Sequence, residues 1–430
     1  RRHGSFVSTT GPLATMMNVN IAVLLPFLYG NGTRLSSESL KTREMTRLSA
    51  DFVCTLKLAL QHVNARNSLV VPELASLSTN FSIMSAEIFN TDVDHDGAGR
   101  PAEAVKSLMD YIHRIRDPLN ENVSAVLGPT YSSVAKPTAL IASAEQVPML
   151  SYFASSRDLS NKKTYPFFTR TYPTDDTAAR ILTRVLYDGS VFTDKDWNHV
   201  AVLYRDDAFG QGYLGAMQDE FDAWTKEMPG QRSISLVNNF NTNDVNKYYT
   251  LGPFAFTEGK PESVKGALKR VKDSSYSIIV LVGGGSSLAT LLEEAENLGL
   301  VTSKHAWFIV EGTVARNSIK EDEKVGPLIS GMQTFEALNE EQEQPGLSSF
   351  LQAWQSMGPT QCNNPFFTPN ETFFATLPIS AAVYLYDGVA AIALAADAAL
   401  KAQGAHEEGG GGEGGSGEGG GKEGGEALLN

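Results

Sequence analysis

The chain has 430 residues, 42% of them hydrophobic and 20% charged, and a formal net charge of −14. This composition excludes a disordered, coiled-coil or fibrous chain and predicts one large domain or a few ordinary ones. The sequence contains no sustained basic stretch that could neutralise phosphates, so we expect no nucleic-acid partner. Cys54 and Cys362 allow at most one bridge, and two cysteines alone do not settle the redox compartment.

Apolar runs and helical periodicity alternate along the chain. Strands are predicted at residues 21–28, 81–88, 123–127, 149–152, 167–170, 199–204, 233–237, 277–282 and 307–310. Helices are predicted between them, at residues 48–63, 102–115, 133–144, 178–187, 213–225 and 288–298. Strands that are apolar throughout and separated by helices predict parallel sheets covered on both faces. The number of strand–helix units is larger than one sheet usually holds. We therefore predict an α/β fold with two doubly wound lobes.

The ends of the sequence differ from its middle. Residues 1–17 are expected to be a disordered segment, and residues 405–426, almost wholly Gly and Glu, predict a flexible one. Residues 379–400 are apolar but contain Asp387 and Asp397, which favours a core helix over a membrane span. The chain turns apolar again at residues 427–430, which suggests that it stops where a further helix would begin.

Ligands of doubly wound sheets bind beyond the carboxyl ends of the strands. The turn at residues 126–133, VLGPTYSS, ends a buried strand and places Ser132 and Ser133 at a helix start. Hydroxyl and N–H groups there can hold a carboxylate or phosphate, although Ser132 could equally be a helix cap. The glycine-rich turn at residues 282–288 lacks the glycine spacing and the lysine of nucleotide loops, so it indicates a nucleotide only weakly.

A short acidic loop has the spacing of a calcium site. Asp92, Asp94 and Asp96, with Glu103 seven residues further on, match the ligand positions of a calcium loop and make Ca²⁺ a candidate ligand. The flanks fit less well, because Pro101 falls inside the loop and the preceding segment is strand-like. The alternative is a solvated acidic turn before a helix. No histidine or serine lies in a catalytic spacing, so we predict a binding protein and not an enzyme.

An ordered set of motifs resembles the type I periplasmic-binding-protein family. The resemblance rests on NIAVLLPF at 20–27, VLGP at 126–129, VPMLSY at 147–152, FFTRTYPTD at 167–175, and WNHV at 197–200 followed by DDAFGQG at 206–212. Within that family, the sequence is most similar to the Venus-flytrap ectodomains of class C G-protein-coupled receptors and receptor guanylate cyclases. The resemblance extends from about residue 18 to residue 400.

The resemblance implies two lobes that clamp a small ligand. Lobe 1 would comprise residues 18–168 and 345–404, and lobe 2 residues 169–337, with pairing into a homo- or heterodimer through lobe 1. In amino-acid-binding relatives, hydroxyls at the positions of Ser132, with Ser133 beside it, and Ser155 hold the α-carboxylate. The remaining implied site residues are Glu311, which meets the ammonium group, Asp175, a further acidic position, and Phe209, which covers the ligand.

The sequence also departs from the glutamate-binding pattern. Residues 87–90 read EIFN where the glutamate receptors have an arginine for the distal carboxylate, which argues against glutamate. We therefore expect the extracellular ligand-binding region of a membrane receptor, with an amino-acid-like ligand and with the membrane-spanning part outside this chain. Three alternatives stay open: a soluble solute-binding protein serving a transporter, an enzyme on doubly wound sheets, and a pseudo-receptor that dimerises without ligand.

Overall fold

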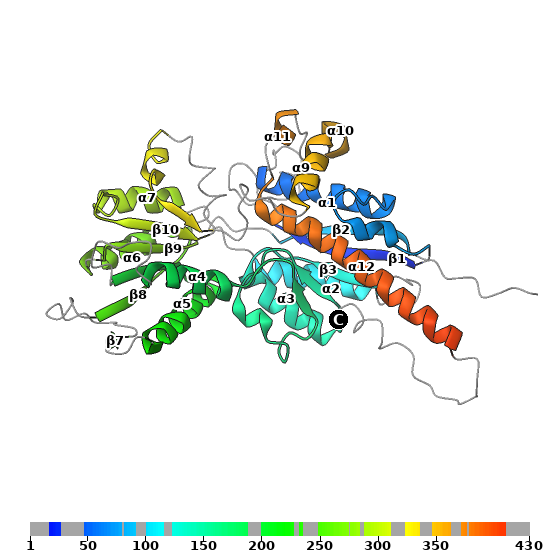
Figure 1. Ribbon diagram of the computed structural model, residues 1–430, viewed down its shortest axis with the longest axis horizontal. Coiled ribbons are helices and arrows are strands. Elements are labelled where there is room, and N and C mark those ends of the chain that lie inside the picture. Colours follow the sequence, from blue (N-terminus) through cyan, green and yellow to red (C-terminus); the bar gives the residue numbers. More distant parts are fainter. Residues whose placement is uncertain are drawn as a thin grey trace, which may run out of the picture.

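The protein folds around two parallel β-sheets, one of five and one of six strands. The computed structural model describes residues 17–26, 47–79, 81–91, 100–115, 123–187, 199–227, 232–234, 248–274, 276–283, 288–310, 323–335, 346–362, 371–375 and 378–409. Figure 1 shows each sheet in its own half of the molecule, flanked by helices. The predicted α/β class with two doubly wound lobes is confirmed.

The first sheet has the strand order β2-β1-β3-β4-β5, with every pair parallel. Its strands are β1 (Met17–Leu25), β2 (Phe81–Asn90), β3 (Val123–Leu127), β4 (Met149–Ser151) and β5 (Phe168–Arg170). Alternate residues of β1 enter two different cores: Ile21 and Val23 face one cluster, Ala22 and Leu24 the other. Burial of both faces explains why residues 21–25 of the strand are all apolar.

Helices cover both faces of this sheet. On one side lie α1 (Arg47–Ala65) and α12 (Ser380–Gly409), which pack against each other, with α9 (Leu347–Ser356), α10 (Pro359–Cys362) and α11 (Glu371–Ala375) beyond them. On the other side, α2 (Pro101–Ile115) packs against α3 (Ser132–Ala144). The C-terminal part of the chain thus returns to the first sheet, so segments far apart in sequence share one core.

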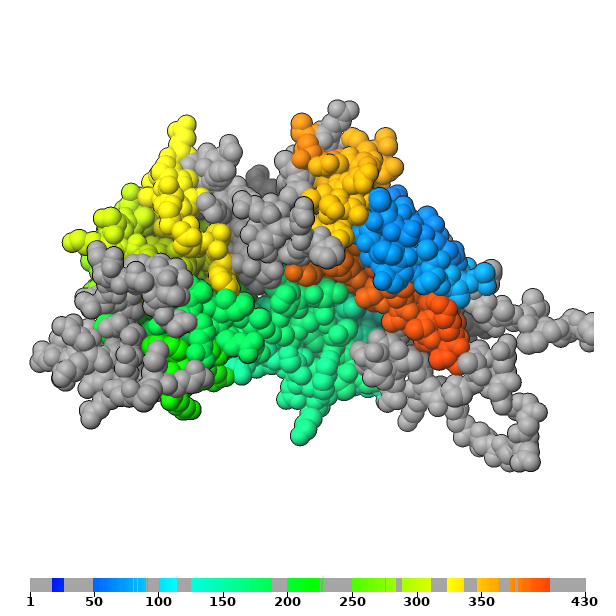
Figure 2. Space-filling model, in the orientation of Figure 1, coloured from blue at the N-terminus to red at the C-terminus, as the bar shows by residue number. Residues whose placement is uncertain are grey.

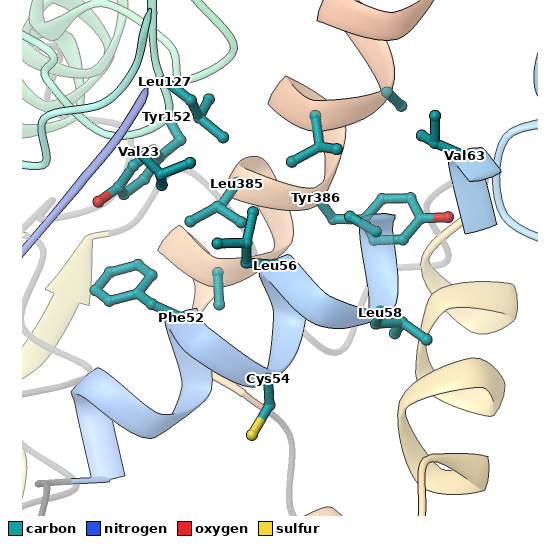
Figure 3. Packing of buried hydrophobic residues seen from close by; sticks show 14 of the residues in the cluster. Val23, Phe52, Cys54, Leu56, Leu58, Val63, Leu127, Tyr152, Leu385 and Tyr386 are labelled. Atoms are coloured by element: carbon teal, nitrogen blue, oxygen red, sulfur yellow. The ribbon is translucent and has the colours of Figure 1, made fainter. Parts of the chain in front are cut away.

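The core between β1, α1 and α12 is shown in Figure 3, where Phe52, Leu56, Leu385 and Tyr386 converge with strand residues. A disulfide joins Cys54 of α1 to Cys362 of α10 across 308 residues of sequence, with the two Cα atoms 5.2 Å apart. The two cysteines, whose pairing the sequence left open, therefore tie the N-terminal and C-terminal parts of this half together.

The second sheet has the order β11-β10-β9-β6-β8-β7 and is also parallel. Its strands are β6 (His199–Arg205), β7 (Arg232–Ile234), β8 (Tyr248–Phe256), β9 (Ile278–Val282), β10 (Ala306–Val310) and β11 (Gln333–Phe335). One face is covered by α4 (Asp175–Tyr187) and α5 (Ala208–Glu227), the other by α6 (Pro261–Asp273) and α7 (Leu288–Asn297). β6 again alternates, with Val202 in one core and Leu203 in the other.

The predicted strands and helices of the second half do not include β8, α6 or the short strand β11. β8 contains the dipeptide Gly252-Pro253, which is typical of a turn, so the sequence did not predict a strand there. Among the described residues, β7 pairs with residues 248–250 of β8 and not with Pro253, in keeping with a residue that cannot donate to the ladder. α6 follows β8 and begins at Pro261, the favoured first position of a helix.

The boundaries expected from the sequence need small corrections. β5 spans the expected lobe boundary at residues 168 and 169, because Thr169 pairs with Leu150 of the first sheet. α12 continues to Gly409, so the first residues of the segment expected to be flexible, 405–409, are helical. β1 already begins at Met17, inside the segment expected to be disordered.

α12 is the one helix among the described residues that is long and apolar enough to cross a membrane, over Ser380–Ala402. Of its most apolar window, 56% is buried inside the protein. Tyr386 of this helix bonds His62 of α1 at 2.7 Å, and Asp397 accepts the Ser78 N–H at 2.9 Å. The prediction of a core helix is therefore confirmed.

The two halves meet where the strands end. In Figure 1 the strand arrows of the second sheet point toward the middle of the molecule, and parallel strands share one carboxyl edge. α5 of the second half packs against α3 and against η3 (Arg157–Ser160), the turn after β4. Figure 2 shows these segments, coloured teal to green, as one continuous surface across the middle. We call this contact region the seam.

Candidate functional site

The seam is built from the turns that follow β3, β4, β5 and β6. Gly128 follows β3 with φ of +110°, and a Cβ there would lie 2.5 Å from the Leu24 carbonyl oxygen. Only glycine fits such a position. The Ser151 hydroxyl at the end of β4 donates to the Pro129 carbonyl oxygen at 2.7 Å and accepts the Ala154 N–H at 2.9 Å. These bonds hold the two serine-bearing turns of the first half beside each other.

The turn after β4 is also held from β5. The Arg170 guanidinium donates to the Ala154 carbonyl oxygen at 3.0 Å and to the Ser156 carbonyl oxygen at 2.9 Å. Ser155 lies between these two residues and is 2% exposed. A half-buried arginine bonded on both sides of Ser155 fixes the position of the Ser155 backbone, so the Ser155 hydroxyl is presented from a rigid turn.

Ser132 lies at the start of α3 and is buried. Its Oγ accepts the Ser156 N–H at 3.1 Å. It does not cap its own helix, for which Tyr131 is the capping position without a side-chain bond. The neighbouring Ser133 Oγ is buried and has no hydrogen-bond partner. The structure thus brings Ser132, Ser133 and Ser155 into adjoining turns of one half.

Asp175 begins α4 and is 2% exposed. Its N–H donates to the Ser155 carbonyl oxygen at 3.0 Å. Within the described part of the chain, its carboxyl oxygen Oδ2 is buried without a hydrogen-bond partner. Burial raises the pKa of Asp175 to about 7, against the opposing effects of the Ser155 hydroxyl and the Arg170 charge. The carboxyl group beside the serines therefore titrates near neutral pH.

α5 reaches this cluster through a glycine. A Cβ on Gly212 would lie 3.1 Å from Ser156 Oγ and 3.6 Å from Asp175 Oδ2. The Ser156 side chain is fully buried, and its hydroxyl has no hydrogen-bond partner. Any larger residue at position 212 would move the helix away from these groups, so the close approach of α5 depends on the absence of a side chain.

Ion pairs surround the cluster at the edge of the seam. Arg157 of η3 pairs with Asp176 of α4, Nε to Oδ1 at 3.3 Å, and its Nη1 pairs with Asp219 of α5. Arg184 of α4 pairs with Glu220 of α5 at 2.5 Å. Arg157 therefore joins the first half to two helices of the second.

A second charged group lies at the ends of β6 and β8. Arg205 Nη1 donates to Glu258 Oε2 at 2.7 Å, and its Nη2 lies 2.7 Å from Asp207 Oδ2. The charges of this group act on Tyr131 of the first half: burial raises the pKa of Tyr131 to about 12, while Arg205 lowers it and Glu258 raises it.

Two further residues predicted for the site, Phe209 and Glu311, are not placed beside the serines by the structure. Phe209 is 7% exposed and lies in the core between the second sheet and α5, with its ring centroid 5.6 Å from the Arg205 guanidinium carbon. This position supports Arg205, and a role as a ligand cover stays a prediction. Glu311 lies outside the described residues, so its predicted contact with an ammonium group also stays a prediction.

The candidate calcium loop cannot be placed, because Asp92, Asp94 and Asp96 lie outside the described residues. Glu103 is described and is exposed on the first turn of α2. Within the described part of the chain, no three His, Cys, Asp or Glu side chains are close enough to hold a metal ion.

Sequence reasoning missed four residues of the seam, which are Ser156, Arg157, Arg205 and Glu258. Arg205 carried a readable signal, because a charged residue that ends an apolar strand marks its carboxyl edge. Glu258 carried none, since the strand before it was concealed by Gly252 and Pro253.

Two doubly wound lobes whose carboxyl edges meet define a ligand-binding region of the type I periplasmic-binding-protein kind. In agreement, the chain matches the family model described as "Receptor family ligand binding region" over residues 55–430. The chain belongs to this family of receptor ligand-binding regions.

Relatives include taste receptor type 1 member 3 of Felis catus, which is 28% identical over 169 residues, 39% of this chain and 17% of that protein. Glutamate receptor 3.7 of Arabidopsis thaliana is 25% identical over 195 residues, 45% of this chain and 18% of that protein. Metabotropic glutamate receptor-like protein E of Dictyostelium discoideum is 26% identical over 117 residues, 27% of this chain and 14% of that protein. The matched segments span less than a fifth of these relatives.

Proposed function

We propose that this chain binds an amino-acid-like ligand at the seam, as the extracellular ligand-binding region of a membrane receptor. The observation that carries the proposal is Asp175, a buried carboxyl group with one unpartnered oxygen beside three serines. A buried acceptor without a donor is unfavourable, and a ligand ammonium group would satisfy it. The adjoining hydroxyls and the start of α3 would hold the ligand carboxylate.

The family supports the receptor assignment, and the disulfide agrees with an extracellular location. The relatives named above are receptors for taste and glutamate by their names. The disulfide between Cys54 and Cys362 is a bond that persists in oxidising compartments. Pairing of two such chains through the first half remains part of this proposal.

Binding would act by favouring the closed arrangement of the two halves. Asp175 and Gly212 belong to elements that pack on the second sheet, whereas Ser132 and Ser155 belong to the first. A ligand that touches both sides binds the closed state better, and only this difference in affinity shifts the equilibrium. A change from mostly open to mostly closed requires about 5.5 kcal/mol of such preference.

A thermal-shift screen with the twenty L-amino acids tests this function, followed by calorimetry on any ligand found. A ligand at 100 times its dissociation constant adds about 2.7 kcal/mol of stability. Asp175→Asn and Ser155→Ala should each weaken binding, the former by about 30-fold or more, because a buried charged contact is lost.

The matched controls are Asp273→Asn and Ser356→Ala, which alter exposed residues far from the seam. They should bind like the wild type. Equal affinity of Asp175→Asn and the wild type for every ligand found would remove this carboxylate from the site and contradict the proposal.

A further inference from the structure

Arg205 occupies the point of the second sheet where ligands of such folds are held. The strand order places β8 on one side of β6 and β9 on the other, so the chain reverses direction across the sheet between β6 and β9. Crevices form at the carboxyl ends of the two strands that flank such a reversal. Arg205 is the last residue of β6, and Gly283 follows β9 with φ of +93°. A Cβ on Gly283 would lie 3.2 Å from the Arg205 Cβ, so the two turns are in contact.

The Arg205 guanidinium lies beside two carboxylates. Arg205 is 9% exposed, and its guanidinium lies 2.7 Å from one oxygen each of Asp207 and Glu258. Burial on its own lowers the pKa of Arg205, but the two carboxylates outweigh burial and raise it. The guanidinium stays charged, and the three side chains together carry one negative charge. A further carboxylate entering this group would meet net repulsion.

The Nε–H group of Arg205 has no acceptor among the described residues, and Nε is buried. Its two terminal nitrogens each lie 2.7 Å from a carboxylate oxygen. An orphaned guanidinium N–H is unfavourable in a protein interior. A ligand oxygen without charge, such as an amide carbonyl or a hydroxyl, would accept this bond without adding to the negative charge.

We propose that Arg205, Asp207 and Glu258 form a subsite for the ligand side chain that accepts a neutral oxygen and rejects a carboxylate. The inference rests on the proposed function and makes the ligand a neutral polar α-amino acid. Its distal oxygen would bond Arg205 Nε, while its ammonium group would meet Asp175. The first turns of α5 connect the subsite to Asp175, because Gly210 lies against the Arg205 carbonyl oxygen and Gly212 against Asp175 Oδ2, so both ends of such a ligand would remain in the seam.

Discrimination between isosteric ligands tests this subsite. We would measure by calorimetry the affinities of the pairs L-glutamine and L-glutamate, and L-asparagine and L-aspartate. The wild type should prefer the amide of a pair by 10-fold or more. Glu258→Gln makes the group neutral, and the preference should fall at least 10-fold through a gain in affinity for the acid. Glu262→Gln, an exposed residue of α6, should leave the ratio unchanged.

The alternative is that the ion pairs only hold the ends of β6 and β8 together, in which case the variants change stability but not the ratio. Asp207→Asn provides a second variant with the same expected change in ratio. Asparagine can keep the cap that Asp207 Oδ1 gives the Phe209 and Gly210 N–H groups. An unchanged ratio in the variants, or a wild type that prefers the acids or a basic amino acid, overturns the subsite alone. Absence of binding by every amino acid overturns the proposed function and the subsite with it.

Discussion

The core of the first half and the seam differ in the buried polar groups that they contain. In the core, His62 bonds Tyr386, the carboxylate of Asp397 accepts the Ser78 N–H, and a disulfide joins α1 to α10. In the seam, polar atoms of Ser133, Ser156, Asp175 and Arg205 are buried without partners among the described residues. A buried hydroxyl in this state also occurs in the core, at Thr55, but the seam has charged groups of both signs, Asp175 and Arg205, in this state.

This difference separates the groups that stabilise the fold from the groups that are available to a ligand. Satisfied bonds and apolar packing fix the core in one arrangement. Unsatisfied charged groups make the seam less stable than its packing would allow, and a ligand that supplies the missing partners would recover that free energy. A region that is optimised only for folding would not retain such groups.

Loss of the disulfide should give the largest effect on folding. In the chain-entropy account, a bridge that closes more than 300 residues contributes about 5 kcal/mol to the free energy of unfolding. Cys54→Ala combined with Cys362→Ala should lose most of this in urea titrations. If binding persists in the remaining folded protein, the core and the seam are separable; equal stability with and without the bridge would contradict the account.

Asp175→Asn should act in the opposite direction on stability. The pKa of Asp175 is about 7 in the folded protein against 3.8 for a free side chain. Between these values the folded state binds more protons, so the free energy of unfolding falls as the pH rises from about 4 to 7. Asparagine removes this loss, and the variant should be more stable at pH 8 by a few kcal/mol, on the order of 1.4 per pKa unit.

The same group should make ligand binding depend on pH. An ammonium ligand needs the ionised carboxylate, so affinity should rise with pH up to about 7 and change little above it. Below that pH, affinity should fall by up to about 10-fold per unit, with proton release detected by calorimetry in buffers of different ionisation enthalpy. A flat profile between pH 5 and 8 would show that Asp175 does not meet the ligand.

Gly212→Ala separates packing of the seam from stability of its helix. Alanine favours a helix over glycine by about 1 kcal/mol, which offsets crowding against Ser156. The free energy of unfolding should change by less than about 1 kcal/mol, while ligand affinity falls because α5 moves from Asp175. Gly210→Ala is the contrasting variant: its Cβ would lie 1.9 Å from the Arg205 carbonyl oxygen, so it should destabilise the fold itself.

Arg157→Gln should have the smallest effect. Arg157 is partly exposed, at 35% of its side chain, so its ion pairs across the seam are screened by solvent. We expect a loss of less than about 1 kcal/mol in urea titrations at low salt and a smaller loss at 1 M salt. A larger loss that is insensitive to salt would mean that packing, and not charge, joins η3 to the second half.

The sequence was sufficient for most strands, and the family resemblance for bringing Ser132, Ser155 and Asp175 together. Strands buried on both faces are apolar throughout, which is why a strand was predicted at residues 277–282, where β9 covers residues 278–282. The turn that carries Ser132 was found because ligands of such sheets bind beyond the carboxyl ends of the strands. Ser155 and Asp175 were added by the resemblance to the family.

The remainder depended on information that the sequence does not display. Pairing of Arg205 with Glu258 joins the ends of two strands across 53 residues, and no local pattern records it. The sequence also did not show that the Phe209 ring packs in the core beside Arg205, because an aromatic residue on the first turn of a helix fits a core or a ligand site; its role as a ligand cover stays a prediction.

The central claim is that a ligand at the seam holds the two halves together. Spin labels at Met109→Cys on α2 and Lys269→Cys on α6, both exposed, would report the distance between the halves, because the two native cysteines are bonded to each other. Pulsed dipolar spectroscopy with the amino acid of largest thermal shift should show a distance distribution that narrows and shortens, and Asp175→Asn should prevent this. Identical distributions with and without the bound amino acid would contradict the account.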